Sequence, residues 1–299
     1  MRVLVTGAGG QLGSALVAGF RAAGTEVVAT TRAELDLASP STWADRIVAA
    51  RPHLIVNAAA YTAVDRAEDD RDAAWAVNAE GAAALARAAA ACDAALLQVS
   101  TDYVFDGRKG APYTEEDDPS PTGVYGASKL AGERAVLAHH ARALVLRTAW
   151  VVSASGHNFL RTMLRLGEER ESLGVVDDQY GAPTFVDDLT DAIIGMAPRL
   201  VSAKAGDPAF GLFHLTGAPH TTWYGFADAI FSETAKRGRK TPALRPIATA
   251  DYPTRAARPL DSRLDCARIS AIHGIAAADW RLSLPRCLDR LLVQGDDGR

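Results

Sequence analysis

Two side chains that can move protons stand four residues apart near the middle of the chain. Tyr125 and Lys129 belong to the run Tyr-Gly-Ala-Ser-Lys, in a segment, 124–139, whose composition favours a helix. Residues at positions i and i+4 share one face of a helix, so the phenol and the ammonium face the same side. A nearby ammonium lowers the pKa of a phenol from about 10 and makes it a proton donor near neutrality. We therefore predict that Tyr125 is a general acid and Lys129 its partner.

A glycine-rich turn stands at the start of the chain. Gly7, Gly10 and Gly13 are spaced three residues apart, between an apolar strand, 3–5, and a helix predicted over 11–23. Glycine lets the backbone approach a phosphate closely, and the N-terminus of a helix attracts anions. A strand, a glycine loop and a helix in this order indicate a dinucleotide site. A tight turn that binds no ligand is the alternative.

The end of the next strand, 26–30, bears on the choice of cofactor. An acidic residue there would bind the ribose 2′-hydroxyl of NAD. The chain instead reads Thr30-Thr31-Arg32, and an arginine suits the 2′-phosphate of NADP, so we expect NADPH, with NADH possible. An arginine that only reaches into water is the other interpretation. Asp36 and Leu37 follow closely and are expected to lie along the adenine.

Polar side chains follow the third and fourth predicted strands. Ligands of parallel α/β sheets bind at the carboxyl ends of strands, so residues after 53–57 and 95–100 are expected to face the cofactor. A hydroxyl from Thr101 or Ser100 can bind a carbonyl that is reduced, and Asp102 can accept a sugar hydroxyl. Asn57 can tie neighbouring loops together, and the small residues up to Ala60 let the backbone approach the cofactor. Each of these polar residues could instead only cap a turn.

The elements that position these residues alternate along the first half of the chain. Apolar strands are predicted at 3–5, 26–30, 53–57, 95–100 and 143–148, and helices at 11–23, 39–50, 69–92 and 124–139. Strands that are apolar on both faces and joined by helices form a parallel sheet covered on both sides. We therefore predict an α/β fold, a Rossmann-type doubly wound parallel sheet.

The second half is less regular and is predicted to hold a smaller, discontinuous C-terminal substrate domain. Residues 1–150 are assigned to the dinucleotide-binding domain, with later returns near 157–177 and 211–215, and residues 178–299 mostly to the substrate-binding domain. Strands at 173–176 and 211–215 are expected to return to the sheet. Helices are expected at 158–169, 186–196, 223–236 and 284–293, loops at 237–246 and 251–264, and a frayed tail at 295–299.

Length and composition exclude several classes of protein. The 299 residues are 48% hydrophobic and 23% charged, which is ordinary for a globular protein. A net charge of −4 disfavours a general nucleic-acid binder, and no apolar run is long enough for a membrane span. Cys92, Cys266 and Cys287 are scattered, which predicts neither a disulfide framework nor a zinc site and fits a reducing cytoplasm.

Together these residues resemble the extended short-chain dehydrogenase/reductases and, more narrowly, the family of dTDP-4-dehydrorhamnose reductases. The matching segments span nearly the whole chain and are 6–13, 57–65, 100–107, 124–129, 147–150, 178–184 and 252–264. The resemblance implies that Thr101, Tyr125 and Lys129 are catalytic. It implies cofactor contacts at Gly10, Gln11, Leu12, Asp36, Leu37, Ala60, Tyr61, Thr62, Tyr125 and Lys129.

The resemblance also implies a substrate, a dTDP-linked 4-keto-6-deoxy sugar. Hydride would pass to C4 of dTDP-4-dehydro-β-L-rhamnose, Tyr125 would protonate the alkoxide, and the product would be dTDP-β-L-rhamnose. The family's sugar-nucleotide contacts fall on Thr101, Asp102 and Trp150, and Arg258 in the C-terminal loop is expected to join them.

The chain departs from the family pattern at two places. Some relatives are metal-bridged dimers with a glutamate shortly after the third loop glycine, where Ser14 and Ala15 stand here, so we expect no metal site. In the C-terminal loop Arg255 replaces a proline and Asp261 an asparagine, whereas Arg258 still matches. Both a monomer and a homodimer stay open.

Two other functions also stay open. A related nucleotide-sugar 4-keto reductase or epimerase could act on another sugar or base, and the His157–Asn158 segment is the nearby candidate for an epimerase's extra acid–base pair. A 4,6-dehydratase would have Asp-Glu after the threonine, but here Asp102 is followed by Tyr103. A regulatory binding subunit of the same fold would be expected to lack the tyrosine or the lysine, and both are present.

Overall fold

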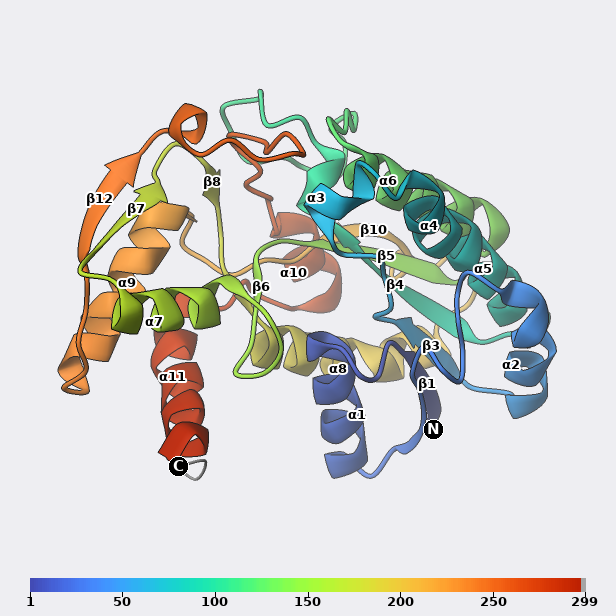
Figure 1. Cartoon of the computed structure of the whole chain (residues 1–299). Helices are drawn as coiled ribbons and strands as arrows, with labels where there is room; N and C mark the ends of the chain where they lie inside the picture. The colour runs from blue at the N-terminus through green and yellow to red at the C-terminus, as the bar shows by residue number, and fades with distance from the viewer. Residues whose placement is uncertain (297–299) are drawn as a thin grey trace.

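A six-stranded parallel sheet forms the centre of the molecule, as the computed structural model of residues 1–296 shows (Figure 1). The strands run in the order β10–β5–β4–β3–β1–β2, and each neighbouring pair is parallel. Their bounds are β1 Arg2–Thr6, β2 Glu26–Thr30, β3 Leu54–Asn57, β4 Ala95–Thr101, β5 Ala143–Thr148 and β10 Gly211–His214. The predicted Rossmann-type doubly wound sheet is confirmed, and the predicted strand at 211–215 lies at its edge.

Helices cover both faces of the sheet (Figure 1). One face packs against α1 (Gln11–Ala22), α8 (Val186–Ser202) and α10 (Ala267–His273), and the other against α2 (Ala44–Ala50), α5 (Ala82–Ala91) and α6 (Val124–His139). Side chains of one strand alternate between the faces, since Val3 and Val5 join the first core and Leu4 the second. Both faces of the sheet are therefore buried, which explains why the strand segments of the sequence are continuously apolar.

The direction of strand addition switches between β1 and β3. From β1 the sheet extends through β2 to one edge, and through β3, β4, β5 and β10 to the other. At such a switch point the loops that follow the two strands diverge and leave room for a ligand. Thr6 at the end of β1 lies beside Asn57 at the end of β3, which in turn lies beside Gln98 in β4. The glycine loop therefore opens at the switch point, beside the carboxyl ends of β3 and β4.

A smaller lobe lies beside the sheet and contains α7 (Phe159–Glu169), α9 (Trp223–Lys236) and α11 (Trp280–Asp296) (Figure 1). Its apolar core includes Phe226, Ile230, Trp280 and Leu284. Three two-stranded sheets complete it: β7 (Ser172–Val176) with β12 (Ala243–Ile247), β6 (Val151–Val152) with β9 (Thr184–Phe185), and β8 (Tyr180–Gly181) with β11 (Thr221–Thr222).

The expected return of 173–176 to the main sheet is wrong. β7 pairs with β12, which lies partly in the segment predicted as a loop at 237–246. The side chains of Ser172–Val176 are exposed, buried, exposed, buried and buried in turn. That alternation at the start suits a two-stranded sheet with one open face, whereas a central strand of a doubly wound sheet is buried on both faces.

Two predicted helices differ from the structure. The helix expected at 39–50 consists of the 3₁₀ turn η1 (Pro40–Thr42) and α2, because Trp43 leaves helical geometry and buries its indole, whose Nε1 donates to the Asp36 carbonyl at 2.8 Å. The helix expected at 69–92 consists of α4 (Arg71–Trp75), the π-helical turn η2 (Ala76–Gly81) and α5. Shorter elements are α3 (Val64–Ala67) and the 3₁₀ turns η3 (Asp102–Val104) and η4 (Thr249–Asp251).

The helices α8 and α11 extend beyond their predicted limits. The predicted frayed tail is wrong at Gly295 and Asp296, which end α11, while its last three residues lie outside the described part of the chain. Among residues 1–296, no helix combines the length and apolar character needed to cross a bilayer. The same residues contain no group of three or more His, Cys, Asp or Glu arranged to hold a metal ion.

Candidate active site

The glycine loop leaves open backbone where the sequence predicts a dinucleotide. Gly7 has a φ of +66°, and a Cβ there would lie 2.8 Å from the backbone of Ala59. A Cβ at Gly13 would overlap the Gly7 carbonyl oxygen, whereas nothing lies within 4 Å of a Cβ built at Gly9. Helix α1 begins without a side-chain cap, so its first N–H groups are available to an anion. The loop therefore fits a diphosphate, and Gly10, Gln11, Leu12 and Gly13 lie where they would hold it.

An amide network fixes the switch point. Asn57 Oδ1 accepts from Thr6 Oγ1 at 2.5 Å and from the Ala59 N–H at 3.2 Å, and Asn57 Nδ2 donates to Gln98 Oε1 at 2.7 Å. All three side chains are buried. Asn57 thus ties β1, β4 and its own loop together, whereas a tie between neighbouring loops was predicted.

Asn78, which the sequence analysis missed, holds the loop after β3. Its Oδ1 accepts from the Tyr61 N–H at 2.9 Å, and its Nδ2 donates to the Tyr61 carbonyl and to Ser128 Oγ, each at 3.1 Å. Asn78 lies in the π-helical turn, so this irregular turn of the helix supplies the amide that joins the 60–62 loop to α6. The signal in the sequence was an asparagine within an Ala-rich helical run.

The adenosine end of the predicted site contains charges of both signs. Glu34 Oε2 accepts from the N–H and the Oγ1 of Thr31, at 2.8 and 3.0 Å. Arg32 is 84% exposed and lies 3.5 Å from the Asp36 carboxylate, so its guanidinium is free to meet a ligand from solvent. Leu37 is buried against Gly81.

Thr101 and Tyr125 meet at the carboxyl end of β4. Tyr125 is 9% exposed, and its ring packs edge-on against Tyr103 with centroids 5.7 Å apart, while the Tyr103 N–H donates to Thr101 Oγ1 at 3.2 Å. Burial raises the pKa of Tyr125 to about 12. The phenol therefore keeps its proton at neutral pH, as a proton donor must.

The expectation that Lys129 lowers the pKa of the Tyr125 phenol is wrong. The Lys129 ammonium turns toward β4, where its Nζ donates to the Val99 carbonyl at 2.7 Å. Burial, and not the ammonium, dominates the pKa of Tyr125, which rises instead of falling. Burial likewise lowers the pKa of Lys129 to about 8, against an opposing pull from Glu133.

Asp102 carries a buried oxygen that faces no hydrogen-bond donor within residues 1–296. Its Oδ1 accepts from Thr101 Oγ1 at 3.0 Å, while its Oδ2 is unpartnered there. Burial raises the pKa of Asp102 to about 6, although the hydrogen bond from Thr101 lowers it. A buried acceptor without a partner is costly, so this oxygen is suited to a hydroxyl of a bound ligand.

The C-terminal loop docks beside these residues. Arg258 donates to Asp65 Oδ2 at 2.6 Å, and its guanidinium carbon lies 5.9 Å from the centroid of the Tyr103 ring. The N–H of Ala256 donates to Asp65 Oδ1 at 3.0 Å. Arg255, the residue that departs from the family pattern, forms an ion pair with Asp69. The loop is thereby fastened to α3 and its neighbourhood, with Arg258 over Tyr103, whose ring packs against Tyr125.

Trp150 stands where the chain leaves the sheet for the smaller lobe. Its φ of +46° is uncommon for a residue with a side chain, and such backbone strain often marks a ligand site. Its indole stacks on Trp223 with ring centroids 3.5 Å apart and planes 10° from parallel. A Cβ at Gly181 would stand 2.6 Å from the Trp150 ring, so glycine makes room for the indole.

The side chain of Gln11 joins the glycine loop to the smaller lobe. Its Oε1 accepts from Ser153 Oγ at 2.7 Å and from Asn158 Nδ2 at 2.9 Å, and its Nε2 donates to the His157 carbonyl at 3.3 Å. Asn158 also caps α7 by accepting from the Arg161 N–H at 3.1 Å. The His157–Asn158 segment is therefore occupied in structural contacts, and His157 itself is exposed.

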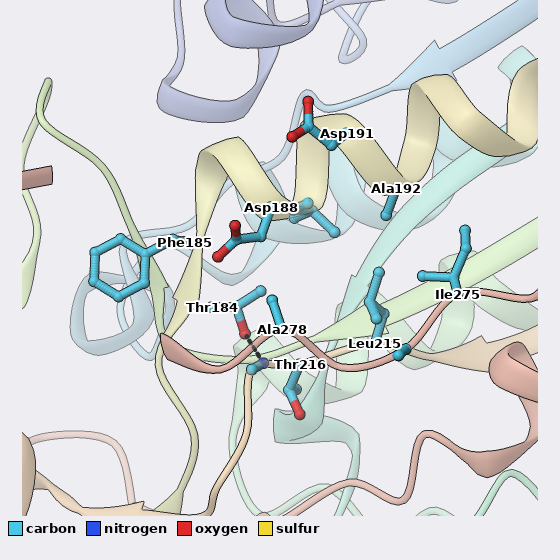
Figure 2. Close-up of a pocket in the computed structure, with 12 residues that line it drawn as sticks. Thr184, Phe185, Asp188, Asp191, Ala192, Leu215, Thr216, Ile275 and Ala278 are labelled. Atoms are coloured by element: carbon cyan, nitrogen blue, oxygen red, sulfur yellow. Dashed lines mark hydrogen bonds between the residues drawn. The ribbon is translucent and has the colours of Figure 1, made fainter. Parts of the chain in front are cut away.

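A cavity of about 250 Å³ lies between α8 and the segments that follow β10 and α10 (Figure 2). Thr184 and Gly217 both line it, and the Gly217 N–H donates to Thr184 Oγ1 at 3.3 Å. Asp188 and Asp191 of α8 also line it. None of the residues predicted for catalysis or cofactor binding does so, and this cavity is thus separate from the candidate active site.

Comparison with known proteins places the chain among sugar-nucleotide reductases. It matches the family described as RmlD substrate binding domain over residues 1–293. A dTDP-4-dehydrorhamnose reductase of Sinorhizobium fredii is 43% identical over 297 residues, which cover 99% of this chain and 100% of that protein.

Two solved structures of enzymes with that name are also similar. The one from Clostridium acetobutylicum has a TM-score of 0.91 and 34% identity and covers 98% of this chain and 100% of its own. The one from Bacillus anthracis, in complex with NADP, has a TM-score of 0.89 and 35% identity over 97% and 99% of the two chains. This chain therefore belongs to the family of the dTDP-4-dehydrorhamnose reductases.

Proposed function

We propose that the protein reduces dTDP-4-dehydro-β-L-rhamnose to dTDP-β-L-rhamnose with NADPH, the last step in the synthesis of this sugar nucleotide. The observation that carries the proposal is the buried Tyr125, whose ring packs against Tyr103 at the carboxyl end of β4, where the Tyr103 N–H donates to Thr101 Oγ1 at 3.2 Å. Membership of the family supplies the identity of the substrate.

Each catalytic residue has a separate task. In the complex, Thr101 donates its hydroxyl proton to the C4 carbonyl oxygen instead of to Asp102 Oδ1, and Tyr125 gives its phenolic proton to the same oxygen as charge develops there. NADPH, when bound, supplies the hydride. Lys129 presents its ammonium to the nicotinamide ribose, and its hydrogen bond to the Val99 carbonyl fixes the side chain.

The cofactor contacts proposed from the sequence surround the switch point. They are Gly7, Gly10, Gln11, Leu12, Gly13, Arg32, Asp36, Leu37, Ala60, Tyr61, Thr62, Tyr125 and Lys129. The first five belong to the open glycine loop and the start of α1, which support the diphosphate. NADH is expected to bind as well, but less tightly.

The proposed substrate contacts are Thr101, Asp102, Trp150 and Arg258. Asp102 offers the unpartnered Oδ2 to a sugar hydroxyl. Trp150 and Arg258 come from the chain's exit to the smaller lobe and from the C-terminal loop. We propose accordingly that residues 1–150 mainly bind the dinucleotide and residues 178–299 mainly the substrate. The cytoplasmic location and the monomeric or homodimeric state stay predictions.

The test is the oxidation of NADPH, followed by absorbance, with dTDP-4-dehydrorhamnose and with UDP- and GDP-linked 4-keto sugars. We expect turnover with the dTDP sugar and at least tenfold lower kcat/KM with the other two. A higher kcat/KM for a UDP or GDP sugar would assign another substrate, and no reduction of any 4-keto sugar would overturn the proposal.

Replacing Arg32 with alanine tests the cofactor preference. We expect NADPH to bind about tenfold more weakly, since one charge-assisted hydrogen bond to phosphate is worth about 1.5 kcal/mol. NADH, which lacks the 2′-phosphate, is expected to lose less than twofold. Arg21→Ala, which removes an exposed charge from the end of α1, is the control and should change neither affinity. Equal losses for the two cofactors in Arg32→Ala would contradict a 2′-phosphate contact.

A further inference from the structure

A buried ion pair lies directly behind the catalytic residues. The Glu133 carboxylate in α6 accepts from Arg147 Nε at 2.9 Å and from Arg147 Nη2 at 2.6 Å. Glu133 Oε1 also accepts from Ser100 Oγ at 2.5 Å. Arg147 is 1% exposed and Glu133 3%. The carboxylate thus joins α6, which carries Tyr125 and Lys129, to β5 and to the end of β4, where Thr101 follows Ser100.

The cluster contains two cations for one carboxylate. Lys129 lies one turn before Glu133 in α6 and is 3% exposed. The elements packed around it bring few other charges. From β10, His214 lies 3.4 Å from Arg147 Nη1, and burial and Arg147 lower its pKa to about 3, so it is neutral. From η2 comes the uncharged Asn78, and Asp102 stands beyond the end of β4.

Of the two cations, Lys129 is the one without a carboxylate in direct contact within residues 1–296, and the one that can lose its proton. A guanidinium keeps its proton at any pH that proteins tolerate, and Arg147 already holds both carboxylate oxygens. The Lys129 ammonium has the Val99 carbonyl as its direct partner and feels the Glu133 charge from a distance. Burial lowers its pKa to about 8, and Glu133 is the charged group that opposes this effect.

We propose that Glu133 is a positioning residue of the reaction, which keeps Lys129 an ammonium and, through Ser100, fixes the strand end that carries Thr101, while Arg147 holds its carboxylate in place. This inference rests on the proposed function for its consequence in turnover, but the charge state of Lys129 is measurable without any substrate.

The direct test is the titration of Lys129 in the ligand-free, full-length protein. The chain has five lysines, so ¹³C-labelled lysine gives five side-chain signals, and the one missing from Lys129→Met belongs to Lys129. In Glu133→Gln we expect that signal to titrate at least one pH unit lower than in the parent protein. Because Lys129 would lose its proton at a lower pH in Glu133→Gln, a smaller fraction of it would be charged at a given alkaline pH.

The lowered titration of Lys129 is expected to change the pH dependence of NADPH binding and of kcat. If the midpoint falls from 8 to 7, the charged fraction at pH 7.5 falls about threefold. NADPH affinity at pH 7.5 should then fall about threefold, and the alkaline limb of kcat should move down by the same one unit, with little change in affinity at pH 6. Glu169→Gln, which removes a carboxylate from an exposed pair in α7, is the matched control and should leave all three readouts unchanged.

A double variant separates this role from a structural one. Glu133→Gln leaves Arg147 buried without its counter-ion and is expected to lower stability, whereas Glu133→Gln with Arg147→Met removes both charges and should recover it in part. Glu133 lies one turn from Lys129 on the same helix and is the charged group that opposes the fall of the Lys129 pKa. The double variant should therefore still show the lowered Lys129 titration, even if the single variant fails to fold.

The outcomes distinguish this inference from the proposed function. A Lys129 signal that titrates as in the parent protein, in either the folded single variant or the double variant, overturns the inference even if the sugar is turned over normally. Conversely, a lowered titration together with no turnover of any 4-keto sugar by the parent protein supports the charge role and refutes the proposed reduction.

Discussion

Tyr125→Phe should lower kcat for the dTDP sugar by a factor of about 10² to 10⁴, the usual contribution of a positioned general acid. The substitution removes one oxygen and keeps the ring, so the edge-on contact with Tyr103 remains. Binding of NADPH, measured by fluorescence titration, should change less than threefold. Without the phenol, the proton for the alkoxide would have to come from water. Water has little access to this position, because the Tyr125 side chain is only 9% exposed.

The matched control is Tyr224→Phe. Tyr224 lies in α9 and packs against the core of the smaller lobe, so the same atom is removed away from Thr101 and Lys129. Its kcat should stay within about twofold of the parent value. Normal turnover by Tyr125→Phe would show that another group protonates the alkoxide and would refute the assignment.

Arg147→Met is expected to lower the free energy of unfolding more than any other single substitution proposed above. Removing one partner of a buried ion pair typically costs about 3–5 kcal/mol, because the remaining charge loses its compensation. In this variant Glu133 would lose the hydrogen bonds that it accepts from Arg147 Nε and Nη2. It would keep the hydrogen bond from Ser100, and Lys129 would be the nearby cation at longer range. The guanidinium also stacks on Phe105, with 5.0 Å from its central carbon to the ring centroid, and methionine replaces only part of that contact.

Equilibrium unfolding in urea measures this loss, with Arg165→Met as the control. Arg165 forms a pair with Glu169 one turn away on α7, and both side chains are more than half exposed. Exposed pairs of this kind contribute less than about 1 kcal/mol, because water screens them. Equal unfolding free energies for the two variants would mean that the buried pair adds nothing to the fold.

The sequence was a good guide to the sheet and its flanking helices. The structure gives β2, α6, β5 and α9 the predicted bounds. These elements combine continuous apolar strands with long helices, and such patterns depend on local periodicity and on burial of both sheet faces. The two-residue strands of the smaller lobe and β12 escaped prediction, because pairing with a distant partner, and not local composition, makes them strands.

The site divides in the same way. The glycine loop was predictable because its conformation demands glycine at Gly7 and Gly13. Glu133 and Arg147 were not, since a glutamate in a helix usually faces water and only the tertiary fold brings the two together. One signal was nevertheless available: Arg147 follows four apolar residues in the strand 143–148, and a charge in a strand buried on both faces needs a partner.

The stack of Trp150 on Trp223 gives the protein a built-in optical probe. Two indoles with centroids 3.5 Å apart and nearly parallel planes are electronically coupled, and such coupling falls steeply as the rings separate. The near-ultraviolet circular dichroism of the chain should therefore carry a paired band from these two of its five tryptophans. A ligand that shifts the Trp150 ring would change that band, so occupancy could be followed in solution without a label or a coupled assay.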